Sequence, residues 1–357
     1  MAKFHKLKVA EIVRETPDCV SVVFDVPAEL KKDFEYIQGQ YLTLKLHING
    51  EELRRSYSLC SSPACDGEIR IAIKKVKDGR GSTFVNDQLK PGDEIEVMTP
   101  MGNFYSALSP SNKKHYVLFA GGSGITPMLS IIKTVLKSEP QSRITLFYGN
   151  RDEASVIFKK QLDELQASNA GRLSVHHILE QGGSDALHTG LLTKETIRQF
   201  VAAHVDLKGD NEYFICGPAP MMENAKAVLT DLSAPKERIH IEYFTAVLEA
   251  VKAAEASGEA GDGLVSKVTV IMDGEETEFE VAANGKPILD LALDAGLDVP
   301  FACKGAVCCT CRAKVMAGKM SMDNNFALTD EEVEQGYVLT CQAHPLTPTV
   351  IVDYDQP

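Results

Sequence analysis

The sequence predicts three successive folding units: a small antiparallel β-barrel, a doubly wound α/β unit and a compact α+β unit. Two changes of rhythm along the 357 residues indicate this division. Short alternating strands come first, and strands that alternate with helices follow. After an Ala-, Glu- and Gly-rich stretch comes a strand pair, a helix and a cysteine-rich loop. At roughly 100–200 residues per domain, the length fits two or three domains.

Residues 1–108 predict the barrel, because short apolar or alternating runs recur between turn signals such as IQGQ, DGRG and KPGD. Regular short strands of this kind are typical of a small barrel or sandwich. The expected strands are 7–13, 21–26, 41–48, 68–76 and 94–100. The run SPSNKK (109–114) is the expected linker to the next unit.

Residues 114–245 predict the α/β unit. Apolar runs that read as buried strands alternate here with longer helical stretches, which indicates a parallel sheet covered on both faces. The expected strands are 115–120, 144–150, 172–179 and 212–217, and the expected helices include 154–168, 193–203 and 219–232.

Residues 246–264 read as a linker, and residues 265–357 as the α+β unit. The runs SKVTVIMDG and ETEFEVAA predict a β-hairpin, and the stretch 287–296 predicts an amphipathic helix.

The chain is acidic, with a net charge of −13, and residues 265–357 alone carry 15 acids and 6 bases. This balance argues against a nucleic-acid partner, since a polyphosphate would be repelled. The acidic C-terminal third is either a solvated face or a docking surface for a basic partner. No signal peptide or membrane span is expected, because Gly, Ser, Thr and Pro interrupt the most apolar stretch, 115–132. We therefore expect a cytoplasmic protein whose cysteines are not a disulfide framework.

Four cysteines form a pattern that can hold metal. Cys303, Cys308 and Cys311 are spaced C-x4-C-x2-C, and Cys341 follows after 29 residues. Four thiolates so spaced are typical of a plant-type [2Fe–2S] cluster. The alternative is a zinc site, although zinc sites usually use two C-x2-C pairs. Cys309, inside the loop, reads as a small apolar filler or as a substitute ligand.

The cysteine loop and its flanks, PILDLALDAGLDVPFACKGAVCCTC and YVLTCQAHP, resemble a plant-type ferredoxin domain over the whole of 265–357. This resemblance implies a β-grasp-like fold.

In the barrel, RSYSLCSS (55–62) offers an Arg for a phosphate, a Tyr for a planar ring and a Ser for a ring nitrogen. Alone it also fits an ordinary half-buried strand. In its context it resembles the flavin site of the ferredoxin–NADP reductase superfamily. That resemblance implies that Arg55 contacts the flavin phosphate and that Tyr57 and Ser58 line the isoalloxazine ring.

The segment GRGSTFVNDQLKPGD (79–93) also matches this superfamily, although a plain loop would read the same way. By the resemblance, Gly81, Ser82 and Thr83 hold the pyrophosphate of FAD at a helix start. FMN stays open as an alternative.

GGSGITP (121–127) follows a strand and opens a helix, as a pyrophosphate site requires. It lacks the GK[ST] of a Walker loop and resembles the GGxGxTP form of the same superfamily. The resemblance also places CGP (216–218) beside the nicotinamide and a Phe over the flavin. The implied residues are Gly121, Gly122, Gly124, Thr126, Pro127, Cys216, Gly217, Pro218 and Phe244. A buried small residue is the alternative for Cys216, which otherwise lies near the hydride path.

The coenzyme is expected to be NADPH rather than NADH. Arg151 and Ser155 follow the second strand of the α/β unit, and an Arg there favours a 2′-phosphate. Asp152 and Glu153 oppose this, so NADH stays possible.

Together the modules predict an oxidoreductase that passes electrons from NAD(P)H through flavin to [2Fe–2S] and then to a partner. The whole chain resembles oxygenase reductases of this domain order, and with DEEVEQGYVLTCQAHP the reductases of phenylacetyl-CoA epoxidase complexes. That resemblance implies a di-iron oxygenase partner in phenylacetate catabolism. The alternatives are another client, such as a fatty-acyl desaturase, a hydroxylase or a hybrid-cluster protein, and a redox sensor without turnover.

Overall fold

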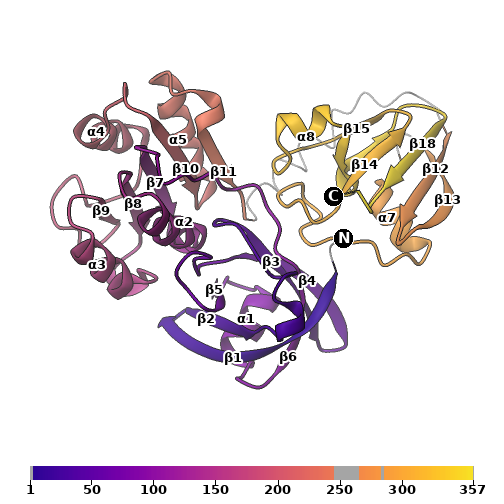
Figure 1. Ribbon diagram of the computed structural model, residues 1–357, viewed down its shortest axis with the longest axis horizontal. Helices are drawn as coiled ribbons and strands as arrows, with labels where there is room; N and C mark the ends of the chain where they lie inside the picture. Colours follow the sequence, from indigo (N-terminus) through magenta and orange to yellow (C-terminus); the bar gives the residue numbers. More distant parts are fainter. Residues whose placement is uncertain (1–2, 245–264, 283–284, 357) are drawn as a thin grey trace.

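The structure is a computed structural model that describes residues 3–244, 265–282 and 285–356. Three lobes follow one another along the chain: a barrel, an α/β lobe and a C-terminal lobe that faces both (Figure 1). The predicted linker 246–264 lies outside the described residues. No helix in the described ranges is long and apolar enough to cross a membrane.

The first lobe is the predicted antiparallel barrel, with strand order β4-β3-β6-β1-β2-β5. A bridge between Leu59 and Ile71 joins the two outer strands and closes it. Inward side chains such as Leu42, Leu44 and Leu46 are completely or almost completely buried, as the alternation of β3 requires. Its elements are β1 (Phe4–Thr16), β2 (Cys19–Asp25), β3 (Tyr41–Ile48), β4 (Glu51–Ser58), β5 (Ile69–Lys74), α1 (Arg80–Asp87) and β6 (Glu94–Met98).

The second lobe is a five-stranded parallel sheet of order β11-β10-β7-β8-β9. Helices α2 and α3 pack on one face, and α4 and α5 on the other. The strand order reverses between β7 and β10, which is where doubly wound sheets bind ligands. The elements are β7 (His115–Gly121), α2 (Ile125–Ser138), β8 (Arg143–Asn150), α3 (Lys159–Ser168), β9 (Leu173–Leu179), α4 (Lys194–His204), β10 (Asn211–Cys216), α5 (Ala219–Asp231) and β11 (Ile239–Glu242).

One helix starts later than its sequence pattern predicts. The helix expected over 154–168 begins at Lys159. Asp152 and Ser155 form a capping box around a short 3-10 turn. Phe158 then adopts a left-handed φ of 61° and is buried in the core, so the helix restarts only after it.

The C-terminal lobe is a mixed sheet of order β13-β12-β18-β14-β16, in which only β12 and β18 are parallel. The hairpin and the helix expected here are both present. The elements are β12 (Val265–Met272), β13 (Glu275–Ala282), α7 (Ile288–Asp294), β14 (Arg312–Ala317), β15 (Met320–Met322), α8 (Asp330–Glu334), β16 (Tyr337–Leu339), β17 (Ala343–Pro345) and β18 (Thr349–Asp353).

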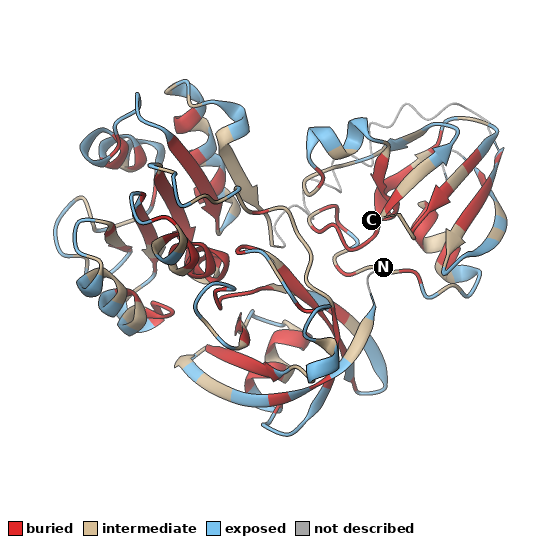
Figure 2. Cartoon of the chain, in the orientation of Figure 1, coloured by how far each residue is buried: buried red, intermediate tan, exposed pale blue. Residues whose placement is uncertain are grey.

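Buried residues gather on the strands of each lobe (Figure 2), and the hydrophobic cores show how the lobes are joined. The barrel residues Cys60, Ala72 and Phe104 belong to the same hydrophobic core as β7 and α2 of the α/β lobe. The C-terminal lobe has a core of its own. It meets the barrel through a small apolar contact of Tyr41 with Ala302 and Cys308.

Candidate functional site

A cavity of about 460 Å³ opens where the three lobes meet. This is within the range of cofactor sites. The barrel contributes the end of β4 and the start of α1, the α/β lobe contributes the loop after β7 and the end of β11, and the C-terminal lobe contributes its cysteine loop. The predicted residues that line it are Arg55, Tyr57, Ser58, Gly81, Ser82, Thr126, Phe244, Cys303 and Cys308.

The RSYS motif lies at the end of β4, on the wall of this cavity. Burial raises the pKa of Tyr57 to about 12, so its phenol stays neutral. Ser58 pairs with Tyr41 across the β3–β4 ladder. The Ser58 hydroxyl donates a hydrogen bond to Glu242 Oε2 over 2.9 Å, which ties the barrel to the α/β lobe.

Glu242 is a residue that the sequence reasoning missed. It ends β11, lines the cavity, and has a pKa that burial raises to about 8. The hydrogen bond from Ser58 opposes that rise. The sequence analysis gives a role to Phe244, at the end of the segment IEYF (241–244), and none to Glu242. The signal that could have identified Glu242 is a carboxylate between apolar residues at a strand end. A carboxyl group that is protonated near neutral pH can both donate and accept hydrogen bonds at the cavity wall.

The start of α1 forms another part of the cavity wall, where a Cβ on Gly81 would lie 3.5 Å from the Tyr57 hydroxyl. No side chain caps this helix at Gly79, so the N–H groups of its first turn have no intrahelical acceptor. Gly81 and Ser82 line the cavity, whereas Thr83 is outside its lining and its N–H donates to Gly79 O over 3.0 Å. The Ser82 hydroxyl already donates to Gly79 O, so this residue offers its backbone.

This donor set fits a flavin nucleotide. A half-buried tyrosine and a serine hydroxyl on the cavity wall suit a planar ring, and the uncapped helix N–H groups together with the Arg55 and Lys74 side chains suit phosphate. The cavity wall therefore offers groups suited to both the ring and the phosphates of a flavin nucleotide.

The two loops of the switch point interlock. A Cβ on Gly124 would lie 2.1 Å from Cys216 O, and one on Gly121 would lie 2.5 Å from Pro218 Cδ. Gly122, by contrast, has a φ of 52° and only Lys74 Nζ within 4 Å. Gly121 and Gly124 are thus required by loop packing, and Gly122 is the glycine whose backbone is open to a ligand.

The other residues predicted for the nicotinamide site lie in or next to these loops. Thr126 donates to Ser123 O over 3.0 Å, and both residues face the cavity. Pro127 is buried in α2, and Gly217 packs against Gly121 N. Cys216 is completely buried and is not in the cavity lining, and burial raises its thiol pKa.

The two residues expected to select the coenzyme are differently placed. Arg151 is exposed and pairs with Asp152 at 3.0 Å. Ser155 is buried, and its hydroxyl donates to Asp152 O over 2.7 Å. Of these two side chains, only that of Arg151 is exposed.

The four predicted cysteine ligands come together as two pairs. The sulfurs of Cys303 and Cys308 are 3.1 Å apart, and Cys311 is in hydrogen-bonding contact with Cys341. In the described ranges no three Cys, His, Asp or Glu side chains converge on a single ion position. Two thiolate pairs suit a two-iron cluster, in which each iron takes two ligands, better than one tetrahedral zinc.

Comparison with protein families divides the chain in the same order. Residues 6–105 match the oxidoreductase FAD-binding domain, residues 118–227 the oxidoreductase NAD-binding domain, and residues 270–346 the 2Fe–2S iron–sulfur cluster binding domain.

Three relatives match along almost their whole length. A component of the 1,2-phenylacetyl-CoA epoxidase of Escherichia coli is 42% identical over 357 residues, 99% of each chain. The ferredoxin reductase component of 3-ketosteroid-9-alpha-monooxygenase from Mycobacterium tuberculosis is 36% identical, over 98% of this chain and 96% of its own. The reductase component of glycine betaine monooxygenase from Pseudomonas aeruginosa is 30% identical, over 98% and 95%.

Among solved structures, phthalate dioxygenase reductase is similar with a TM-score of 0.58 and 25% identity over 98% of both chains. A type IV self-sufficient cytochrome P450 monooxygenase has a TM-score of 0.70 at 19% identity, over 98% of this chain and 41% of its own. The second likeness shows the shared fold alone.

Proposed function

Because the chain belongs to the family of oxygenase reductase components with successive FAD-binding, NAD-binding and 2Fe–2S domains, we propose that its client is a phenylacetyl-CoA epoxidase. The family assignment makes the chain an NAD(P)H-dependent oxidoreductase that passes electrons through FAD and [2Fe–2S] to an oxygenase. The client, the residues that hold the cofactors and the domain limits are the proposals.

One observation carries the electron route: a single cavity is lined by the β4 motif, by the start of α1 and by two cysteines of the cluster loop. A flavin held by these residues would supply the exchange between hydride transfer from the coenzyme and single-electron transfer to the cluster. The chain's own residues bind and orient the two carriers against each other.

We assign the following roles on this basis. Arg55 and the first turn of α1 hold the flavin phosphates, and Tyr57 and Ser58 line its ring. Gly122 and Thr126 hold the coenzyme pyrophosphate, Phe244 covers the ring, and Glu242 with Ser58 fixes the hydrogen bonds at the cavity wall. Cys303, Cys308, Cys311 and Cys341 hold the cluster. The domain limits we propose are 1–108, 114–245 and 265–357.

The client proposal is supported by 42% identity along the whole chain to the E. coli epoxidase component. It implies a di-iron oxygenase component in phenylacetate degradation, with NADPH as the preferred donor through Arg151. A cytoplasmic location accompanies it, since the nine cysteines, all within the described residues, form no disulfide. The second candidate client is a steroid 9α-monooxygenase, which the 36% identity to such reductases favours.

The test is to mix the purified chain with a purified phenylacetyl-CoA oxygenase component and NADPH, with and without phenylacetyl-CoA. We expect product formation in proportion to substrate-dependent NADPH oxidation. NADPH oxidation that is independent of the substrate and gives no product would show that the chain is a reductase but that this client is wrong. The same assay with a ketosteroid oxygenase component distinguishes the second candidate.

A further inference from the structure

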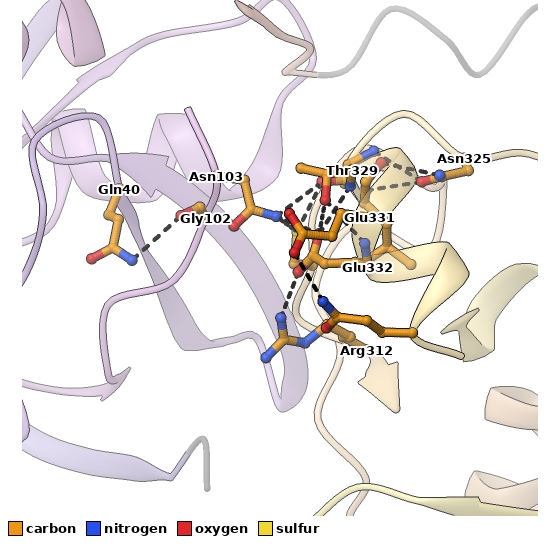
Figure 3. Close-up of polar contacts among 12 residues, drawn as sticks. Gln40, Gly102, Asn103, Arg312, Asn325, Thr329, Glu331 and Glu332 are labelled. Atoms are coloured by element: carbon orange, nitrogen blue, oxygen red, sulfur yellow. Dashed lines mark hydrogen bonds and ion pairs between the residues drawn. The ribbon is translucent and has the colours of Figure 1, made fainter. Parts of the chain in front are cut away.

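Besides the ion pair of Arg54 with Asp298, the C-terminal lobe contacts the barrel at four residues that we call the docking corner: Gln40, Tyr41, Gly102 and Asn103. Tyr41 and Met101 exchange two backbone hydrogen bonds, of 2.8 and 3.0 Å. Gly102 has a φ of 119°, and a Cβ there would lie 2.9 Å from the Tyr41 ring. Gln40 Nε2 donates to Gly102 O over 3.3 Å and fixes the loop (Figure 3).

The docking corner binds the two residues that separate the expected ligands Cys308 and Cys311. Tyr41 Oη accepts a hydrogen bond from Cys309 N over 2.9 Å and lies 3.3 Å from Thr310 Oγ1. Asn103 Nδ2 reaches Cys309 Sγ at 3.7 Å from the other side. Cys309 and Thr310 are both almost fully buried in this contact.

Asn103 also donates a hydrogen bond to the carboxylate of Glu332, which other residues of the C-terminal lobe hold in place. Its Nδ2 lies 2.8 Å from Glu332 Oε2. The other oxygen of Glu332 accepts from Arg312 Nη1 over 2.6 Å. Glu332 Oε2 accepts in addition from Thr329 N in the capping box of α8 (Figure 3). The carboxylate is therefore fixed by its own lobe before it meets the barrel, and a hydrogen bond to such a charged group is strong.

We propose that Tyr41 and Asn103 are positioning residues for electron transfer between the flavin and the cluster. They orient the C-terminal lobe through Cys309, so that Cys303 and Cys308 face the cavity of the proposed flavin site. The inference rests on the proposed cofactor sites and not on the identity of the client. It gives Cys309 a docking role in place of the filler role expected from the sequence.

The test introduces a repulsion between two carboxylates at the contact and then removes it with a second substitution. Asn103→Asp places a second carboxylate against Glu332, and Asn103→Asp with Glu332→Gln restores a donor and an acceptor while keeping a capping-box residue. Glu331→Gln is the matched control, because Glu331 is an exposed neighbour on α8 that bonds Gln335 within its own lobe. All variants are studied as the cofactor-loaded full chain.

Five readouts are taken without any oxygenase: the stopped-flow rate of cluster reduction by NADPH, the rate of ferricyanide reduction, hydrogen exchange over residues 301–312, cluster content and melting temperature. In Asn103→Asp we expect cluster reduction to slow about tenfold or more, by the loss of a charged hydrogen bond. Exchange should become faster over that segment, with ferricyanide reduction, cluster content and melting temperature unchanged. The double variant should recover wild-type rates of cluster reduction and of hydrogen exchange, and Glu331→Gln should behave as the wild type.

Wild-type rates of cluster reduction and exchange in Asn103→Asp would overturn the proposal, as would slow reduction that Glu332→Gln fails to relieve. If Asn103→Asp does not fold, Tyr41→Phe tests the same contact, since it removes the acceptor of Cys309 N. Unchanged exchange and cluster reduction in Tyr41→Phe would overturn the proposal equally. A failure of the proposed cofactor sites would instead appear in the wild type, as NADPH that reduces no cluster.

Discussion

Glu242→Gln should remove one component of the pH dependence of stability. In the folded chain Glu242 titrates with a pKa of about 8, against an ordinary value of 4.5, because burial disfavours its charged form. Between these values the folded state holds a proton that the unfolded state has lost. The free energy of unfolding therefore falls as pH rises from 4.5 to 8, and this contribution is fully present only below 4.5.

The size of the effect follows from 1.36 kcal/mol per pH unit for one full proton. Between about pH 5.5 and 7.5 the folded state holds most of one extra proton. The free energy of unfolding of the wild type should therefore fall by about 2–3 kcal/mol over that interval because of Glu242. A change of 1 kcal/mol shifts the melting temperature by about 2–4 °C for a domain of this size, so the melting temperature should fall by roughly 5–10 °C. Glutamine keeps the hydrogen bond from Ser58 and carries no titrating proton.

The assay is thermal release of the flavin, followed by fluorescence at saturating FAD, for wild type and Glu242→Gln across about pH 5.5–7.5. The melting temperature of the wild type should fall relative to the variant as pH rises, and other titrating groups cancel in the difference. Parallel curves would refute the reasoning, because they would mean that Glu242 is already ionised in the folded chain.

Three further outcomes are expected. Cys341→Ser should abolish the visible bands of the cluster while NADPH-dependent ferricyanide reduction persists, and equal loss of both would contradict separate carriers. Gly124→Ala should slow reduction of the flavin by NADPH by at least about tenfold, because its Cβ would lie 2.1 Å from Cys216 O and displace both loops; stopped-flow flavin bleaching measures this, and a wild-type rate would show that the loops are not coupled. Arg151→Ala should raise KM for NADPH about tenfold and leave KM for NADH unchanged, since a single exposed charge is removed from the 2′-phosphate; steady-state kinetics with both coenzymes decide, and equal effects would exclude this role.

Local patterns were the part of the fold that the sequence predicted well. Strand β3 has the expected bounds 41–48, and the cysteines could be found by spacing alone because three of them share one loop. Strand β4 was not among the expected strands, although its second half, in RSYSLCSS, was read as fitting a half-buried strand, because the run EELRRSYS has few apolar residues. Its polar side chains are explained by tertiary contacts, as with Arg54, which is buried against Asp298 of the C-terminal lobe at 2.6 Å.

Residues whose roles depend on packing between lobes could not be found in this way. Glu242 acquires its raised pKa only where β11 meets the barrel, and Tyr41 meets the amide of Cys309 across 268 residues of sequence. The pattern GGSGITP indicates glycines that give a ligand room. For Gly121 and Gly124 it is the neighbouring CGP loop that leaves no space for a side chain.

The core that Cys60, Ala72 and Phe104 share with β7 and α2 has a consequence for how such proteins can be assembled from parts. Removing the α/β lobe would expose that buried apolar face, so barrel and α/β lobe should melt as one cooperative unit and be inherited together. The C-terminal lobe has a closed core, and its contact with the barrel combines a small apolar cluster with hydrogen bonds and an ion pair. It is therefore the part that recombination can exchange. The same flavin and nicotinamide unit can in this way be combined with different electron-transfer domains.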